Sequence, residues 1–217
     1  MREKRGVNES GGRVFVIDDD PSVCRGLSRL LRSAGYETEL FHSAADYLER
    51  DPYEGVGCLV LDIRMPKLSG TELQLHLNEQ HSNLPIIFLT GHGDLPMGIK
   101  AMKRGAEDFL TKPVDEEALL DAVQRSLARH RAVRIRRRES ADAQARVDTL
   151  TPREFEVLQR ILGGAINKEI AKDFSISEKT VKAHRAKVMA KMAASTPAEL
   201  GGICASLNIT PKITASQ

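Results

Sequence analysis

The sequence predicts two domains in series, an α/β domain built on a parallel sheet and then a smaller domain made only of helices. Up to about residue 124, short apolar runs alternate with stretches of helical periodicity, which is typical of a parallel sheet covered on both faces. After residue 149, the apolar residues recur only at helical spacing. A length of 217 residues also favours two compact domains.

Five strands and five helices are expected in the first domain. Apolar runs predict buried strands at 13–17, 57–61 and 85–89, with a shorter one at 107–110. Residues 36–41 alternate poorly and are the fifth candidate. Apolar side chains at helical spacing predict three of the helices: Leu27, Leu30 and Leu31, then Ile99 and Met102, and finally Leu119, Leu120, Val123 and Leu127. Leu73, Leu75 and Leu77 fit a helix less cleanly and mark a further one.

A basic linker is predicted at 129–148, helical at its start. Arginine dominates this region and the few residues before it: Arg125, Arg129, Arg131, Arg134, Arg136, Arg137 and Arg138. The preferred interpretation is a solvated extension of the preceding helix. The alternative is a basic arm that touches a phosphate backbone.

The second domain, 149–210, is predicted to contain four helices. Thr151 and Glu154 flank Pro152 in an N-terminal helix signature. Asn167 is expected to cap a short second helix, Ser177 to open the third and Thr196 the fourth. The expected core is apolar: Phe155, Leu158, Ile161, Leu162, Ile170, Ala171, Val181, Val188, Met192, Leu200, Ile203 and Leu207. Residues 1–12 are expected to be a disordered lead-in and 211–217 a tail without structure.

Charge is distributed unevenly along the chain. The net charge is −7 for residues 1–124, +5 for 125–149 and +4 for 150–217. This asymmetry predicts a cation as the partner of the front half and a polyanion as the partner of the back half. The absence of Trp and the low aromatic content count against a surface that stacks single-stranded bases.

Cysteine usage and hydropathy indicate the compartment. Cys24, Cys58 and Cys204 lie far apart in the sequence and form no CxxC pair, so neither a disulfide framework nor a zinc site is expected. No run approaches the roughly 18 apolar residues that cross a bilayer. A cytoplasmic protein without a membrane partner is the expectation.

Polar groups follow four of the predicted strands. Asp18 and Asp19 come after the first, Asp62 after the third, Thr90 after the fourth and Lys112 after the last. Because parallel strands end at one edge of the sheet, these groups are expected to converge there. Carboxylates without His or Cys favour Mg²⁺, and an ammonium and a hydroxyl suit phosphate oxygens. The edge therefore predicts magnesium and phosphoryl chemistry.

The residues around this edge resemble the receiver domain of bacterial two-component response regulators, over about residues 12–128. Four blocks carry the resemblance: Ile17-Asp18-Asp19-Asp20, Leu61-Asp62-Ile63-Arg64-Met65-Pro66, Leu89-Thr90-Gly91-His92-Gly93-Asp94 and Thr111-Lys112-Pro113. The stretch that begins at Thr90 is similar to the FixJ branch. The resemblance implies a receiver domain at 13–128, with a five-stranded parallel sheet in the order 2-1-3-4-5 and helices on both faces.

The resemblance also implies a role for each residue of the edge. Asp62 would accept a phosphoryl group from the phosphohistidine of a sensor histidine kinase. Lys112 would contact that group, Thr90 would close onto it, and Phe109 would rotate inward. The bond between Lys112 and Pro113 would be cis. Mg²⁺ would be held by four residues: Asp19 and Asp62 directly, Asp18 through water, and Arg64 through its backbone carbonyl.

Residues 149–210 resemble the LuxR-type helix-turn-helix of NarL/FixJ regulators. The resemblance rests on three blocks: Leu150-Thr151-Pro152-Arg153-Glu154, Asn167-Lys168-Glu169-Ile170-Ala171 and the segment from Ile176 to Arg185. Phe174 stands where Leu is common, and Gly201-Gly202 lies inside the last helix, where each Gly costs about 1 kcal/mol relative to Ala.

The third helix of this domain is predicted to enter the major groove of double-stranded promoter DNA. Lys182 and Arg185 are the candidates for base contacts, and Ala183 lies on the same face. Phosphate contacts are expected from Lys179, Thr180, His184 and Lys187.

The predicted function is a phosphorylation-controlled regulator of transcription and not an enzyme. Unphosphorylated chains would be mostly monomeric, and phosphorylated chains would form a homodimer through the face built from residues 94–127. RNA polymerase is a further expected partner. A phosphorylation-independent DNA-binding protein with a degenerate receiver is one alternative. An aspartyl phosphohydrolase is another, although Arg64 occupies the position where such enzymes carry a second Asp.

Overall fold

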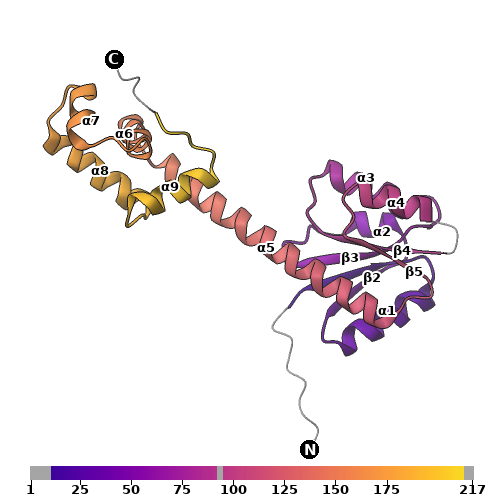
Figure 1. Cartoon of the computed structure of the whole chain (residues 1–217). Coiled ribbons are helices and arrows are strands. Elements are labelled where there is room, and N and C mark those ends of the chain that lie inside the picture. The colour runs from indigo at the N-terminus through magenta and orange to yellow at the C-terminus, as the bar shows by residue number, and fades with distance from the viewer. Residues whose placement is uncertain (1–10, 92–94, 213–217) are drawn as a thin grey trace, which may run out of the picture. The chain divides into compact units, whose positions relative to one another are not determined.

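The computed structural model describes residues 11–91 and 95–212, and within these ranges it leaves the side chains of residues 95 and 96 undescribed. Most of the lead-in predicted to be disordered and the end of the predicted tail therefore lie outside the described residues. Contacts within the chain divide it into two compact units, residues 1–134 and 135–217 (Figure 1). In the described part of the chain, no helix has both the length and the apolar character needed to cross a membrane.

A five-stranded parallel sheet forms the centre of the first unit. Its strands are β1 (Arg13–Ile17), β2 (Glu37–Phe41), β3 (Gly57–Asp62), β4 (Ile86–Thr90) and β5 (Asp108–Thr111). They lie in the order β2-β1-β3-β4-β5, which confirms the predicted topology. The register aligns their carboxyl ends, because Ile17 pairs with Leu61 and Asp62 pairs with Leu89.

Helices cover both faces of this sheet, as the alternation of apolar runs predicts. They are α1 (Pro21–Ser33), α2 (Ala44–Glu49), α3 (Gly70–Glu79), α4 (Leu95–Lys103) and α5 (Glu116–Asp148). Phe15, Leu59 and Phe88 point to the core shared with α2, α3 and α4. Val14 and Val60, one residue away in their strands, point to the opposite core with α1 and α5. Figure 1 shows α2, α3 and α4 on one face of the sheet and α1 and the start of α5 on the other.

Helix α4 exists as predicted, but the two apolar side chains that predicted it do not face the core. Ile99 is 48% exposed and Met102 is 37% exposed. The inner side of α4 contains Met97, which packs against the core, and two small residues: Ala101 is fully buried, and Gly98 lies against the ring of Phe109. Gly and Ala therefore permit a close approach of α4 to the sheet, and Ile99 and Met102 remain on the outside.

Helix α3 holds the carboxyl end of α4 through two amide side chains. Gln74 Nε2 donates to the carbonyl of Ala101 at 3.1 Å, and Asn78 Nδ2 donates to the carbonyl of Arg104 at 3.2 Å. The last carbonyls of a helix lack partners within that helix. The two amides, one helical turn apart on α3, satisfy carbonyls at that end, which the hydrophobic pattern alone did not indicate.

Helix α5 continues through the whole segment predicted as a linker, residues 129–148, and not only through its start. Ala, Arg, Gln and Glu, which favour the helix, make up much of this segment. Packing on the sheet also continues past residue 128, because buried His130 accepts a hydrogen bond through Nδ1 from the Gly57 N–H at 3.1 Å. Burial of the imidazole lowers the pKa of His130, and the nearby charge of Arg134 adds to this effect.

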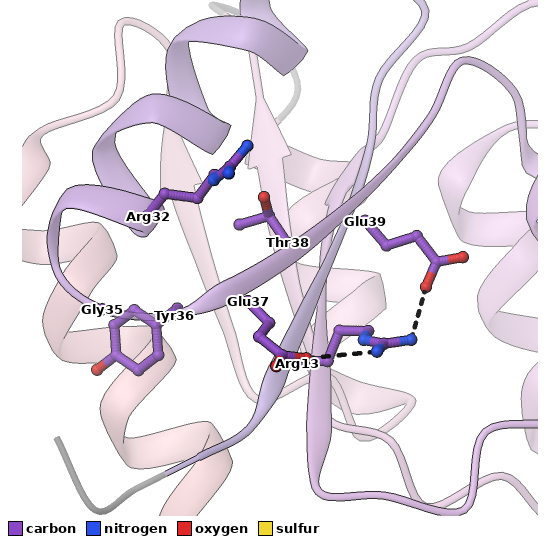
Figure 2. A pocket seen from close by; sticks show the side chains of 7 residues that line it. All are labelled: Arg13, Arg32, Gly35, Tyr36, Glu37, Thr38 and Glu39. Atoms are coloured by element: carbon purple, nitrogen blue, oxygen red, sulfur yellow. Dashed lines mark hydrogen bonds and ion pairs between the residues drawn. The ribbon is translucent and has the colours of Figure 1, made fainter. Parts of the chain in front are cut away.

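A shallow pocket of about 500 Å³ lies beside the edge strand β2. Figure 2 shows the Arg13 guanidinium bound to Glu37 and Glu39, at 3.3 and 3.2 Å. Arg13 pairs with Glu37 at the first position of the two strands, so this pocket lies away from their carboxyl ends. Charged side chains on an exposed edge hinder pairing with a strand of another chain, and that is the role these residues suit.

The second unit contains four helices after α5. They are α6 (Pro152–Leu162), α7 (Asn167–Phe174), α8 (Glu178–Met192) and α9 (Pro197–Ser206). Val181, Val188 and Met192 of α8 are fully buried, as predicted. They pack with residues from the other three helices, including Leu158, Ile170 and Leu200.

Hydrogen bonds at the helix starts correct one prediction. Thr151, Ser177 and Thr196 cap α6, α8 and α9 as expected. Asn167 does not cap α7, since the N-cap position is Ile166, whose N–H donates to the Glu169 carboxylate at 2.9 Å. A carboxylate at the third helical position satisfies the N-cap amide, and the helix begins without a side-chain cap from Asn167.

The chain after Ile209 is more ordered than predicted up to residue 212. It has no helix or strand there. The Lys212 N–H nevertheless donates to the carbonyl of Gln159 at 3.1 Å, and the Lys212 carbonyl accepts from Arg160 at 3.2 Å. These two bonds attach the segment to α6.

Replacing Gly202 by Ala is expected to stabilise the second unit by about 0.5–1 kcal/mol, because Gly202 is helical and exposed and a Cβ there meets nothing within 4 Å. Urea unfolding followed by circular dichroism measures the change. Gly164→Ala is the matched control: Gly164 has φ +77°, so the added Cβ is strained and stability should fall. Equal shifts in the same direction would contradict this account.

Candidate functional site

Three carboxylates lie together at the carboxyl edge of the sheet. Asp18 and Asp19 follow β1, and Asp62 is the last residue of β3. One carboxylate oxygen from each lies within 4.8 Å of the others. Asp18 and Asp62 are buried, whereas Asp19 is exposed. Three carboxylates this close together repel one another, and a nearby cation would relieve the repulsion.

Lys112, the residue after β5, supplies one positive charge. Its Nζ lies 2.7 Å from Asp18 Oδ2 and 3.2 Å from Asp62 Oδ1. The peptide bond between Lys112 and Pro113 is cis. The other oxygen of Asp18 accepts the backbone N–H of Asp20 at 3.0 Å, so the Asp18 carboxylate is held from two sides.

The burial of these groups changes their ionisation. Burial raises the pKa of Asp62, the charge of Lys112 lowers it, and the charge of Asp18 adds to the rise, so the pKa lies above its ordinary value. Burial also opposes the charge on Lys112, but its hydrogen bond to Asp18 and the charge of Asp62 outweigh burial and raise the pKa of Lys112. The Lys112 ammonium beside Asp62 therefore remains charged.

Gly70 lies against the backbone of Asp62, which sequence reasoning missed. Gly70 is the first residue of α3, and its N–H donates to the Ile63 carbonyl at 3.0 Å. A Cβ on Gly70 would lie 2.1 Å from the Asp62 carbonyl oxygen. Glycine is needed at position 70 because the two backbone segments approach closely, and not because of an unusual φ. In the sequence, this contact is indicated only by the presence of a glycine eight residues after Asp62.

Thr90, Phe109 and Arg64 lie around the carboxylates in different ways. Thr90 is the last residue of β4 and is buried, and its hydroxyl donates to the Gly91 carbonyl at 3.3 Å. Phe109 is partly buried in β5 and packs against the core under α4. The backbone N–H of exposed Arg64 lowers the pKa of Asp62, opposing the effect of burial. The structure does not bring the hydroxyl of Thr90 into a hydrogen bond with the carboxylates of Asp18, Asp19 or Asp62.

In the second unit, α7 and α8 form a helix-turn-helix pair. The turn between them contains Ser175, whose φ is +54°, and the Ile176 N–H donates to the Ala171 carbonyl at 3.0 Å. The outer side of α8 carries exposed residues over its first half: Lys179, Thr180, Lys182, Ala183, Ala186 and Lys187. This exposed, basic helix surface has the shape and charge that a major groove accepts.

Two predicted DNA-contact residues lie toward the interior of this unit. The Arg185 guanidinium donates to the Ala165 carbonyl at 3.1 Å, in the loop before α7. His184 is partly buried, and its Nδ1 has no hydrogen-bond partner among the described residues. Lys182 is therefore freer than Arg185 to reach a base edge in this conformation.

Interactions between α6 and α7 hold the first helix of the helix-turn-helix pair in place. The Arg153 guanidinium lies 3.7 Å from the centre of the Phe174 ring and donates to the Phe174 carbonyl at 3.1 Å. Phe174, unusual at this position, thus provides a ring for a cation–π contact. Buried Arg160 forms an ion pair with Asp173 of α7. These contacts fix α7 against α6.

Lys191 of α8 is bound to the start of α6. Its Nζ lies 2.6 Å from Glu154 Oε2 and 2.8 Å from the Thr149 carbonyl. The hydrogen bond from Lys191 and the backbone N–H of Thr151 lower the pKa of Glu154 to about 2, from 4.5. The same carboxylate completes the capping box of α6.

The stability that Glu154 provides should depend on pH. A depressed pKa means that the contribution is fully present above pH 4.5 and is lost as the pH falls toward 2. Glu154→Gln should therefore be less stable than the wild type at neutral pH, and the difference should shrink across that window. Urea midpoints measured from pH 6 to pH 2 test this, with Glu178→Gln, an exposed carboxylate of α8, as the control. A difference independent of pH would contradict it.

Family models match both units. The model for the response regulator receiver domain matches residues 14–124, and the model for bacterial regulatory proteins of the luxR family matches residues 148–200. The chain therefore belongs to the two-component response regulators that join a receiver domain to a LuxR-type DNA-binding domain, which are phosphorylation-controlled regulators of transcription.

Curated relatives and solved structures agree with this family. Nodulation protein W of Bradyrhizobium diazoefficiens is 42% identical over 93% of this chain and 88% of its own. The response regulator TodT of Pseudomonas putida F1 is 40% identical over 90% of this chain and 86% of its own. The structure of the response regulator StyR matches with a TM-score of 0.84 and 45% identity, covering 90% of this chain and 98% of that chain.

Proposed function

We propose that Asp62 is the phosphoacceptor through which a sensor histidine kinase controls this regulator. One observation carries the proposal: the Lys112 ammonium bridges Asp18 and Asp62 at the end of the sheet. An Asp62 oxygen would attack phosphorus of a phosphohistidine, the imidazole would leave, and an acyl phosphate would form. The reaction needs positioning and charge neutralisation more than a base, and Lys112 provides both beside the transferred oxygens.

The acidic cluster fits a magnesium ion. Three carboxylates whose oxygens lie within 4.8 Å of one another suit a hard cation, and the cluster includes no His or Cys from the residues that the structure describes. Asp18, Asp19 and Asp62 would hold it, with the Arg64 carbonyl as a further ligand. When bound, Mg²⁺ neutralises negative charge on the carboxylates and the phosphoryl group. The Lys112 ammonium, which contacts Asp18 in this structure, would then also contact a phosphoryl oxygen.

Phosphorylation is proposed to act through Thr90, Phe109 and α4. The Thr90 hydroxyl, bound only weakly to the Gly91 carbonyl, is available to an acyl phosphate on the neighbouring strand. Phe109 packs beside Gly98 of α4, so a movement of the ring changes the surface of that helix. Exposed Ile99 and Met102 give α4 an apolar patch suited to pairing two phosphorylated chains.

The homodimer would place two α8 helices on adjacent half-sites of promoter DNA. Lys182 and Ala183 are proposed to face base edges, and Lys179, Thr180 and Lys187 to contact phosphates. Arg185 and His184 contribute mainly by positioning α8. RNA polymerase is proposed as a partner of the DNA-bound dimer.

Intact-protein mass spectrometry tests the central step. Incubation with acetyl phosphate and Mg²⁺ should add the mass of one phosphoryl group, and peptide mapping after borohydride trapping should place it at Asp62. Chelation of Mg²⁺ should suppress the adduct. No adduct, or an adduct at another residue, would overturn the proposal.

A further inference from the structure

Arginines divide α5 into two parts with different electrostatics. Arg125 and Arg129, near the sheet, form ion pairs with Asp108, Asp121 and Glu107. Four later arginines form no ion pair or side-chain hydrogen bond with any described residue: Arg134, Arg136, Arg137 and Arg138. We call residues 134–138 the arginine segment. Every residue in it is exposed.

This arrangement is unfavourable for a helix in isolation. Arg134 lies three and four residues before Arg137 and Arg138, so these like charges are neighbours on one side of α5. Residues 134–139 are all exposed, so the segment also lacks a buried apolar face. Ile135, the one apolar residue among the arginines, is 51% exposed. A polyanion bound along the segment would remove the repulsion.

We propose that the arginine segment binds the phosphate backbone of double-stranded DNA beside the site read by α8. The compact unit that contains α8 also contains Arg136, Arg137 and Arg138. The DNA that α8 binds is therefore the polyanion available to these arginines. Helix α5 contains eight arginines and no lysine. Guanidinium groups pair with phosphate oxygens through two parallel hydrogen bonds, which a lysine ammonium cannot do.

These contacts would carry no sequence information. Phosphate contacts add affinity and set position, whereas base contacts choose the sequence. The arginine segment would therefore add affinity for DNA of any sequence. This inference rests on the proposed function, because that function supplies DNA as the binding partner. Its signature is the salt dependence of binding, because each neutralised phosphate releases condensed counterions.

The test uses the full-length chain and a random-sequence duplex, which needs neither a known operator nor phosphorylation. Affinity is measured by fluorescence anisotropy from about 50 to about 200 mM salt. Each lost contact should reduce the slope of log K against log salt by about 0.9, so R136Q/R137Q/R138Q should reduce it by about 2.7. Glutamine keeps the helix propensity close to that of arginine, and circular dichroism checks that helicity is retained.

R25Q/R29Q/R32Q is the matched control, since it removes three exposed arginines from α1 and lowers the net charge equally. Its slope should stay within about one unit of the wild type, as no phosphate contact is lost. Equal slopes for the two triple variants would overturn the proposal. Tighter binding by R136Q/R137Q/R138Q would also overturn it, by showing that the segment's partner is the acidic receiver. If the wild type itself binds no DNA, the proposed function fails too.

Discussion

Asp62→Asn is expected to abolish the increase in DNA affinity that acetyl phosphate produces in the wild type. An amide cannot form the acyl phosphate, and every later step depends on that group. Shifting the protein from about 1% active to about 99% active needs about 5.5 kcal/mol of free energy. The variant would lose all of that free energy that comes from phosphorylation. Anisotropy titrations with and without phosphodonor measure the effect.

Basal DNA binding should survive this substitution. Asn is close to Asp in size, and removing one of three clustered negative charges relieves repulsion around Asp18. Asp51→Asn is the control, because Asp51 is exposed and lies outside the acidic cluster. It should respond to acetyl phosphate as the wild type does. A response retained in Asp62→Asn would remove the phosphoacceptor role from this residue.

Gly70→Ala is expected to destabilise the first unit by about 1–3 kcal/mol. The added Cβ would lie 2.1 Å from the Asp62 carbonyl oxygen and 3.1 Å from Leu61 Cγ, so the backbone of β3 or the start of α3 must shift. Because this shift involves the residue proposed to be phosphorylated, the rate of adduct formation with acetyl phosphate should fall as well. Urea unfolding and time-resolved mass spectrometry measure the two effects.

Gly26→Ala provides the comparison within the same unit. Gly26 is exposed on α1, and a Cβ there meets nothing within 4 Å. This variant should gain a little stability from helix propensity and keep the wild-type rate of phosphorylation. If Gly70→Ala behaved like Gly26→Ala, close approach to Asp62 would not be the reason for glycine at position 70.

Much of the first unit could be predicted because its three central strands, β1, β3 and β4, are buried on both faces. Three apolar runs identified β1, β3 and β4 to within one residue, the shorter apolar pair Phe109-Leu110 identified β5 equally well, and the residues that follow these strands are polar. Parallel pairing then places Asp18, Asp62 and Lys112 at one edge, whatever the details of the helices. The weak alternation at 36–41 reflects the position of β2 at the edge of the sheet, where Phe41 is the one buried residue of the strand.

Features that depend on how helices approach one another could not be predicted in this way. The periodicity of Ile99 and Met102 indicates a helix but not which side faces the core, and the side that packs there carries Met97, Gly98 and Ala101 instead. The choice between Lys182 and Arg185 for base contacts likewise depends on a carbonyl in a loop twenty residues earlier. Local patterns contain no information about such distant partners.

The order of elements, the edge at which the acidic groups emerge, the two kinds of domain and the uneven charge follow from the sequence alone, since they depend on patterning along the chain. Tertiary structure alone decided that Gly70 lies against Asp62, that Gln74 and Asn78 hold α4, and that Arg134, Arg136, Arg137 and Arg138 of α5 form no ion pair within the described part of the chain. Each of these features is a contact, or a missing contact, between residues far apart in the sequence. Packing of the helices and strands determines such contacts, and local sequence patterns do not.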